Sequence, residues 1–182
     1  TPVGFFKESV DFDKGYEDPV HSIRRQSEGI YAMLHFLAYE KENGRRHPEW
    51  EQKMKNMLDI LLRLQQADGS FPRKFRDDFT IVDTSGGSTP SATLPLVMGY
   101  KYFKDKRYLA SAKQTADYLE KVLISKADYF SSTLDANCED KEASLYAATA
   151  TYYLSLITKG DEHRHYADLT KKAAYFALSW YY

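Results

Sequence analysis

The sequence predicts an all-α protein built from three consecutive helical hairpins, in which inner and outer helices alternate. Three segments carry apolar residues at the 3.6-residue period of a helix with one buried face. Each is preceded by a segment that is apolar or small on nearly all sides, as buried helices are. Short and long connections between these segments also alternate along the chain. Together the three observations predict an inner and an outer layer of helices.

The outer helices are predicted from their amphipathic stripes, and they share a register. Trp50 and Tyr108 are 58 residues apart, and Tyr108 and Tyr166 are again 58 apart. A fixed period of this size is typical of stacked supersecondary units that bury one face against their neighbours. The predicted outer helices span residues 48–66, 107–123 and 161–182.

The inner helices are predicted at residues 22–42, 90–104 and 139–159. Short connections follow them, whereas long ones precede them, at 67–89 and 125–137; an extended leader, residues 1–21, occupies the equivalent place before the first. In an up-and-down arrangement all long connections emerge at one end. We call this end the rim: the leader, the two long connections and the first turns of the inner helices. Long loops on one face of a rigid scaffold are where function is usually carried.

Composition excludes several classes of partner. The 25 basic and 26 acidic residues give a net charge of −1, without the basic surface of a nucleic-acid binder. No apolar run approaches the length of a membrane span. The histidines form no recognisable metal-ligand set and no phosphate-binding loop is present, so neither metal nor cofactor is predicted. The single Cys138 precludes an internal disulfide, and one cysteine does not separate cytoplasm from periplasm. The location stays unknown, with a periplasmic or secreted one slightly favoured over a cytoplasmic one.

Three short stretches carry a resemblance to a known family. Residues 65–71 (Gln-Gln-Ala-Asp-Gly-Ser-Phe) close an outer helix, with Gly69 expected at positive φ in a turn. Residues 85–92 and 135–143 open inner helices. With the inner–outer alternation, these stretches resemble the six-hairpin glycosidase superfamily. The resemblance implies an (α/α)6 toroid with its substrate cleft at the N-terminal ends of the inner helices, and a carbohydrate ligand.

The chain departs from that family in its length. A complete toroid has six hairpins, whereas residues 1–182 supply three, and the sequence begins without Met and has no helix stop signal near Tyr182. We expect one domain that is a fragment of a longer toroid, or a half that associates with the missing half or a second copy. A competing resemblance, to terpenoid cyclases, rests on Gln65, Gly69 and Phe71, but their repeat does not recur after the next outer helix.

Glycosidic bond cleavage requires two carboxyl groups, one protonated and one ionised. Asp83 and Asp135 are the predicted catalytic pair, because each lies shortly before an inner helix. Neither is the expected helix cap, since Thr89 and Asn137 suit that role better. Glu139 and Asp140 are explained by helix capping and the helix dipole, although Glu139 is retained as a substrate-binding candidate. Asp77 and Asp78 are interpreted as solvating their loop.

The remaining binding candidates each have two interpretations. Arg24 and Arg25, near His21 and Glu28, would bind a uronate carboxylate or form ion pairs with Glu28 or a loop acid. The rings of Phe71, Phe75 and Tyr129 would stack on sugars or fold down onto the helix ends. Arg73 would bind a sugar hydroxyl or solvate the loop. A non-catalytic glycan- or protein-binding module and a polysaccharide lyase, which needs a Tyr or His base beside an Arg, remain as alternatives to a hydrolase.

Overall fold

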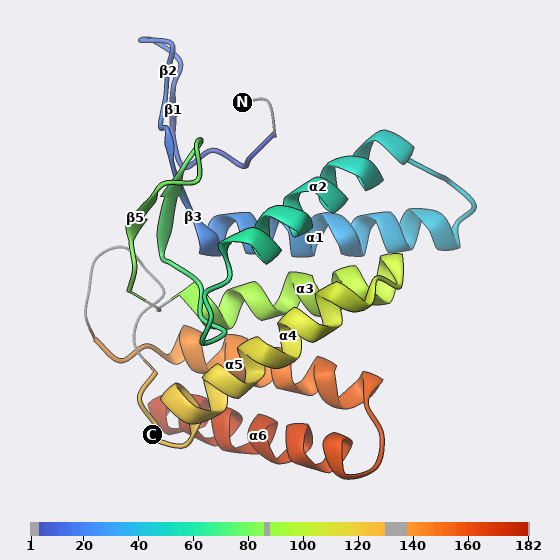
Figure 1. Ribbon diagram of the computed structural model, residues 1–182, viewed down its shortest axis with the longest axis vertical. Coiled ribbons are helices and arrows are strands. Elements are labelled where there is room, and N and C mark those ends of the chain that lie inside the picture. Colours follow the sequence, from blue (N-terminus) through green and yellow to red (C-terminus); the bar gives the residue numbers. More distant parts are fainter. Residues whose placement is uncertain (1–3, 86–87, 130–137, 182) are drawn as a thin grey trace.

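The computed structural model describes residues 4–85, 88–129 and 138–181. Six α-helices form three hairpins, as predicted (Figure 1). The π-helical segment η2 (Leu119–Ile124) prolongs α4, and the 3-10 segment η3 (Ser179–Tyr181) follows α6. The hairpins pair α1 (Ile23–Glu42) with α2 (Pro48–Leu64), α3 (Thr89–Phe103) with α4 (Lys106–Tyr118), and α5 (Lys141–Ile157) with α6 (Gly160–Leu178).

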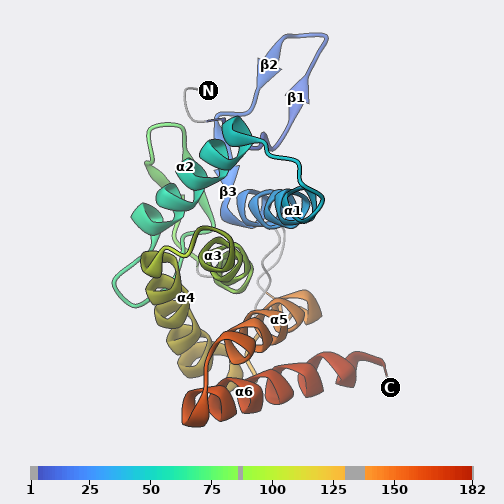
Figure 2. The same ribbon diagram turned by 90° about the vertical axis from the view of Figure 1, so that its right-hand side faces the viewer.

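The helices form the two predicted layers. The inner helices α1, α3 and α5 pack in a row, and each contacts its own outer helix (Figures 1 and 2). Every residue from 89 to 99 of α3 is buried, because α3 lies between α1 and α5 with α4 behind it. The repeat positions Tyr108 and Tyr166 are buried and Trp50 is half-buried. None of the described helices is both long and apolar enough to cross a membrane.

The described part of the rim lies at one end of the molecule, as predicted. The first turns of α1, α3 and α5 lie together at that end, and the short connections lie at the other (Figure 1). Five short strands, which were not predicted, occupy the leader and the first long connection. The strands are β1 (Val10–Asp11), β2 (Tyr16–Glu17), β3 (Val20–Ser22), β4 (Lys74–Arg76) and β5 (Ile81–Asp83).

The strands form two small antiparallel sheets. β1 and β2 form a hairpin that projects from the leader, and β3, β4 and β5 form a sheet in that order. In the second sheet His21 lies opposite Phe75, which brings the leader onto the first long connection. Strands of two or three residues are too short to show the alternating pattern by which a strand is recognised in a sequence.

The cap of α3 differs from the predicted one, whereas Asp140 of α5 has the capping role that was one of its predicted interpretations. Ser88 precedes α3, while the hydroxyl of Thr89 instead accepts a hydrogen bond from the amide of Phe71 at 3.0 Å. The prediction that Thr89 caps this helix is therefore wrong. Asp140 caps α5, because its Oδ1 accepts from the amide of Glu142 at 2.8 Å. The predicted cap Asn137 lies outside the described residues.

Candidate functional site at the rim

Asp83 ends β5 and is half-buried at the rim. Its Oδ1 accepts hydrogen bonds from the amide and the hydroxyl of Ser85, at 2.9 and 2.7 Å. Its Oδ2 lies 3.9 Å from the Arg73 guanidinium. Burial alone would raise the pKa of Asp83, but the Ser85 hydrogen bonds and the Arg73 charge outweigh it and hold the pKa below its ordinary value. Asp83 is therefore a carboxylate at neutral pH.

Arg73 is buried between the strands and α1. Its amide donates to the Asp83 carbonyl at 2.9 Å, and its carbonyl accepts from the amide of Ile23 at 3.0 Å. Only 7% of the residue is exposed. Arg73 thus joins β5 to the first turn of α1 and does not solvate the loop, which corrects that interpretation.

His21 is fully buried and holds a carboxylate at the surface. Its Nε2 lies 2.7 Å from Oδ1 of Asp77, and its ring packs against Phe5 and Phe75, with centroids 4.6 and 5.4 Å away. Asp77 is therefore held in place and does not merely solvate its loop. Because His21 is 0% exposed, it positions Asp77 and presents no surface to a ligand.

Arg24 and Arg25 form ion pairs, which is the second of their two predicted roles. Nε of Arg24 lies 2.8 Å from Glu28, and Nη2 lies 3.0 Å from Glu142. Arg25 pairs with Glu8 of the leader at 3.0 Å. Three carboxylates thus surround the two guanidinium groups.

Tyr146 completes this cluster from α5. Its hydroxyl donates to Glu28, and the Arg24 guanidinium lies 5.8 Å from its ring centroid. Burial and the hydrogen bond to Glu28 raise the pKa of Tyr146 to about 12. Burial would raise the pKa of Glu28, but the hydrogen bonds from Arg24 and Tyr146 lower it overall.

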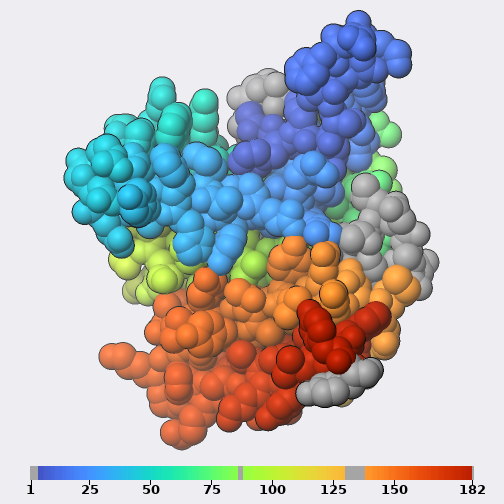
Figure 3. All heavy atoms as spheres, turned by 180° about the vertical axis from the view of Figure 1, so that it is seen from behind, coloured from blue at the N-terminus to red at the C-terminus, as the bar shows by residue number. Residues whose placement is uncertain are grey.

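These contacts join α1 directly to α5 across α3. Further along the same helices, the hydroxyls of Tyr31 and Tyr153 are 2.8 Å apart, and Lys101 of α3 lies 5.7 Å from the Tyr153 ring centroid. Figure 3 shows this face, with α1 (blue) beside α5 (orange) and α3 (light green) visible between them. The first and third hairpins therefore contact each other through polar and aromatic side chains.

The predicted stacking rings are not available to a ligand. Phe71 and Phe75 are 0% exposed and Tyr129 is 1% exposed. Tyr129 packs on Phe176 of α6 at a centroid distance of 4.4 Å. These rings fold down onto the helix ends, which is the second of their two predicted interpretations. The helix ends offered them apolar surface that the loop sequence alone does not reveal.

The structure assembles part of the predicted set and adds residues that were missed. Glu139 is exposed beside the start of α5, and Asp135 lies outside the described residues. Glu142 and Tyr146, four residues apart at the start of an inner helix, had a spacing that could have singled them out. Glu8 carried no such signal. Among the described residues, no His, Cys, Asp and Glu side chains are grouped to hold a metal ion.

Known proteins resemble this chain in fold. No family model matches the chain. The unsaturated glucuronyl hydrolase of Bacillus sp. GL1, described as responsible for the degradation of glycosaminoglycan, superposes with a TM-score of 0.67, covering 94% of this chain and 48% of that one. The chain has the fold of half a six-hairpin glycosidase toroid.

A second solved structure agrees with this half-toroid fold. An unsaturated glucuronyl hydrolase specific for heparin gives a TM-score of 0.67 over 93% of this chain and 49% of its own. Sequence identities are 15% and 19%. The half-toroid thus spans about half the length of both enzymes, and the likeness is one of fold.

Proposed function

We propose that the half-toroid carries a glycoside hydrolase site at its rim, with Asp83 as the ionised carboxylate of the catalytic pair. The observation that carries this proposal is the environment of Asp83: two hydrogen bonds from Ser85 and a nearby guanidinium, which keep it charged. An ionised carboxylate is what the nucleophile or general base of a glycosidase must be. Its half-buried position leaves one side open to a ligand.

Asp135 is the proposed proton donor. It precedes α5 as Asp83 precedes α3, and these two inner helices pack side by side. Packed helices lie roughly 8–10 Å apart, which is comparable to the ~5–9.5 Å that separates the carboxyl groups of glycosidases. Residues that precede neighbouring inner helices can therefore approach to the distance that the reaction requires.

The charges at the rim favour an uncharged oligosaccharide. Arg24 and Arg25 already face Glu28, Glu142 and Glu8. A uronate would have to displace one of these carboxylates, at the cost of leaving it unpaired. We expect neutral glycans to be hydrolysed faster than their uronate-containing counterparts in a screen of matched oligosaccharides.

Three substitutions test the catalytic pair. Asp83→Asn and Asp135→Asn should each lower kcat/KM for glycan hydrolysis by about 10²–10⁴-fold, the usual contribution of a general acid or base. Asp78→Asn is the matched control, because Asp78 accepts an equivalent hydrogen bond from the amide of Thr80, at 2.9 Å, in the same connection. Hydrolysis that is unaffected by Asp83→Asn would remove Asp83 from the mechanism.

A lyase is the second candidate, since Tyr146 lies beside Arg24 as a lyase base would. Two observations weigh against it. The pKa of Tyr146 is raised to about 12, so the phenol keeps its proton, and Arg24 is engaged by two carboxylates. The products distinguish the reactions, because a lyase forms an unsaturated uronate that absorbs in the ultraviolet and a hydrolase of neutral glycans does not.

A further inference from the structure

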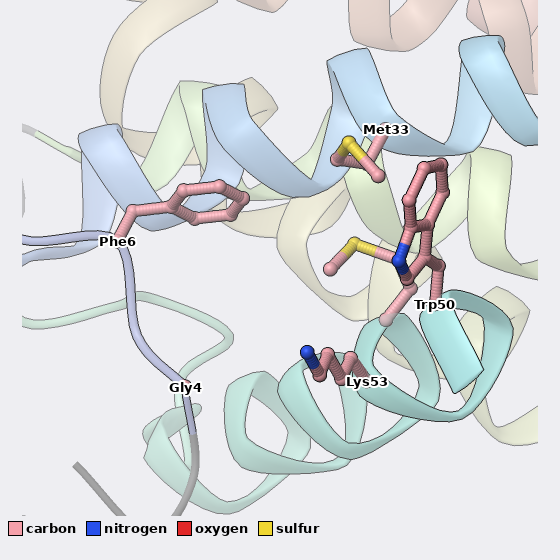
Figure 4. A pocket seen from close by; sticks show the side chains of 6 residues that line it. Gly4, Phe6, Met33, Trp50 and Lys53 are labelled. Carbon is pink, nitrogen blue, oxygen red and sulfur yellow. The ribbon is translucent and has the colours of Figure 1, made fainter.

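A small pocket lies between the leader and the first hairpin, and none of its residues takes part in the Asp83 or Arg24–Glu28 contacts described above. It has a volume of about 210 Å³. Phe6 and Gly4 come from the leader, Met33 from α1, and Trp50, Lys53 and Met54 from α2. Figure 4 shows the side chains of Phe6, Met33, Trp50 and Lys53 arranged around this space.

The leader wall of the pocket is fixed by two contacts. The amide group of Gln26, which is buried, accepts a hydrogen bond from the Phe6 amide at 2.9 Å and donates to the Phe6 carbonyl at 2.7 Å. The Phe6 ring also lies directly on α1: a Cβ at Gly29 would be 2.3 Å from it. The position of Phe6 is therefore set by the fold.

The opposite wall is equally well held. The indole of Trp50 stacks on His47 with a centroid distance of 4.5 Å and an interplanar angle of 10°, and it contacts Phe36 at 5.8 Å. Met33 and Met54 complete the pocket with flexible thioethers, which make favourable contacts with aromatic rings. The walls thus present mostly apolar and aromatic surface.

One charge faces this apolar surface. Among the described residues of the lining, Lys53 is the cationic one and none carries a carboxylate. Lys53 reaches the pocket from α2, on the side where Figure 4 shows the Trp50 ring nitrogen. An ammonium group at the edge of an aromatic pocket suits a ligand that combines a ring with an anionic group.

We infer that this pocket binds a small aromatic carboxylate, with its ring between Phe6, Met33 and Trp50 and its carboxylate on the Lys53 ammonium. The volume lies below the ~300–1,000 Å³ of pockets for larger ligands, so a single ring is the appropriate size. Neither the rim carboxylates nor glycan cleavage takes part in this binding.

The test uses phenylacetate and its uncharged analogue phenylacetamide. Titration calorimetry on the whole chain should show phenylacetate binding at least several-fold more tightly than phenylacetamide. Lys53→Met should weaken phenylacetate binding by about tenfold, the value of one charge-assisted hydrogen bond, and leave phenylacetamide binding unchanged. Lys55→Met, an exposed lysine of the same helix, should change neither.

Trp50 provides an independent readout. In a Trp180→Phe background Trp50 is the only tryptophan, and phenylacetate should change its fluorescence with the midpoint seen by calorimetry. Met33→Phe, which fills the pocket, should abolish that change. The inference is overturned by absence of phenylacetate binding, by equal affinity for the amide, or by an affinity that Lys53→Met leaves intact.

Discussion

Gly69 and Gly44 both adopt positive φ, at 91° and 75°, but only Gly69 is also confined. A Cβ at Gly69 would lie 2.3 Å from the Gln114 carbonyl oxygen, whereas nothing lies within 4 Å of one at Gly44. Both alanine variants incur the left-handed penalty of about 1–2 kcal/mol. Gly69→Ala should lower the free energy of unfolding by roughly 1–3 kcal/mol more than Gly44→Ala, because it also overpacks the backbone of α4.

Urea unfolding of the two glycine variants measures this difference directly. Equal losses of stability would mean that the connection moves away from α4 at no cost. The positive φ of Gly69 was predicted from the Asp68-Gly69 pair, because that pair is local turn chemistry. The contact with Gln114 was not predictable, because it joins segments far apart in the sequence.

Asp83 predicts the pH dependence of the proposed hydrolysis. Because the pKa of Asp83 is lowered, its carboxylate stays ionised at pH values below the ordinary pKa of an aspartate. The acidic limb of kcat/KM should therefore lie below about pH 4, the ordinary aspartate value. Ser85→Ala removes one hydrogen bond to the charged form, raises the pKa and should move that limb to higher pH. Ser70→Ala, which removes the equivalent 2.7 Å bond to Asp68, should leave the profile unchanged.

Local pairs were predictable from the sequence and distant ones were not. Arg24 and Glu28 are four residues apart on one helix, so their ion pair was among the expectations. Glu142 reaches the same guanidinium from the third hairpin, and Glu8 reaches Arg25 from the leader. Ion pairs of this kind depend on which segments become neighbours in the fold. A single sequence gives only the spacing of residues within one helix or strand, so these pairs could not be predicted.

At the scale of elements, Glu40 closes the first hairpin. Its carboxylate accepts from Nε of Arg45 at 2.8 Å and lies 2.9 Å from Nε2 of His47, just before α2. Hydrogen bonds from Arg45 and His47 lower the pKa of Glu40 to about 2. The contacts of ionised Glu40 with Arg45 and His47 therefore stabilise the fold above the pKa of about 4.3 that Glu40 has in the unfolded chain. That contribution is lost as the pH falls toward 2.

Glu40→Gln should consequently lower the stability of the protein more at neutral pH than at acidic pH, with almost no loss at pH 2. Thermal unfolding of both proteins between pH 7 and pH 2 tests this, with Glu42→Gln, an exposed neighbour, as the control. Curves for wild type and Glu40→Gln that stay parallel throughout would contradict the role given to this carboxylate.

The Tyr31–Tyr153 hydrogen bond predicts coupling between α1 and α5. In a double-mutant cycle Tyr31→Phe and Tyr153→Phe should show an interaction energy of about 0.5–1.5 kcal/mol, the net value of one hydrogen bond. Tyr31→Phe combined with Tyr152→Phe should be additive, because the hydroxyl of Tyr31 is paired with that of Tyr153 and Tyr152 is 49% exposed. Additivity in the first cycle as well would show that the two helices are energetically independent.

Helix positions were predicted closely, and the errors have local causes. α1 was expected from residue 22 and begins at Ile23, because Ser22 caps it. The helix predicted from residue 139 begins at Lys141, because Asp140 takes the cap position. The predicted outer helix at 107–123 changes to π-helical geometry at Leu119, and the periodicity of the side chains does not distinguish the two forms.

For the whole molecule, the last hairpin carries an uncovered apolar face. Leu145, Tyr152 and Leu156 of α5 are exposed and recur at a helical spacing, and Tyr175 and Leu178 of α6 are also exposed. The chain covers 48% of the Bacillus sp. GL1 hydrolase, and in a complete ring of stacked hairpins the next one would pack against the last. The predicted partner there, the missing half of the ring or a second copy, stays a prediction, but the exposed area itself has a measurable consequence.

The dye 1-anilinonaphthalene-8-sulfonate should bind this face, because dyes of this kind report contiguous apolar surface. Leu145→Gln with Leu156→Gln should reduce its fluorescence strongly. Ile81→Gln with Val82→Gln, two comparably exposed residues of β5, should reduce it much less. A signal that the α5 pair leaves unchanged would place the dye elsewhere.

The enclosure of α3 sets the width of the molecule at the rim. Ser91, Ala92 and Thr93 are buried at the start of that helix, while Arg24 and Glu142 meet from the helices on either side of it. A bulkier side chain at any of the three would have no free space, because α3 packs against α1, α4 and α5. The diameter of α3 therefore sets the distance between α1 and α5, and with it the distance between Glu28 of α1 and Glu142 of α5.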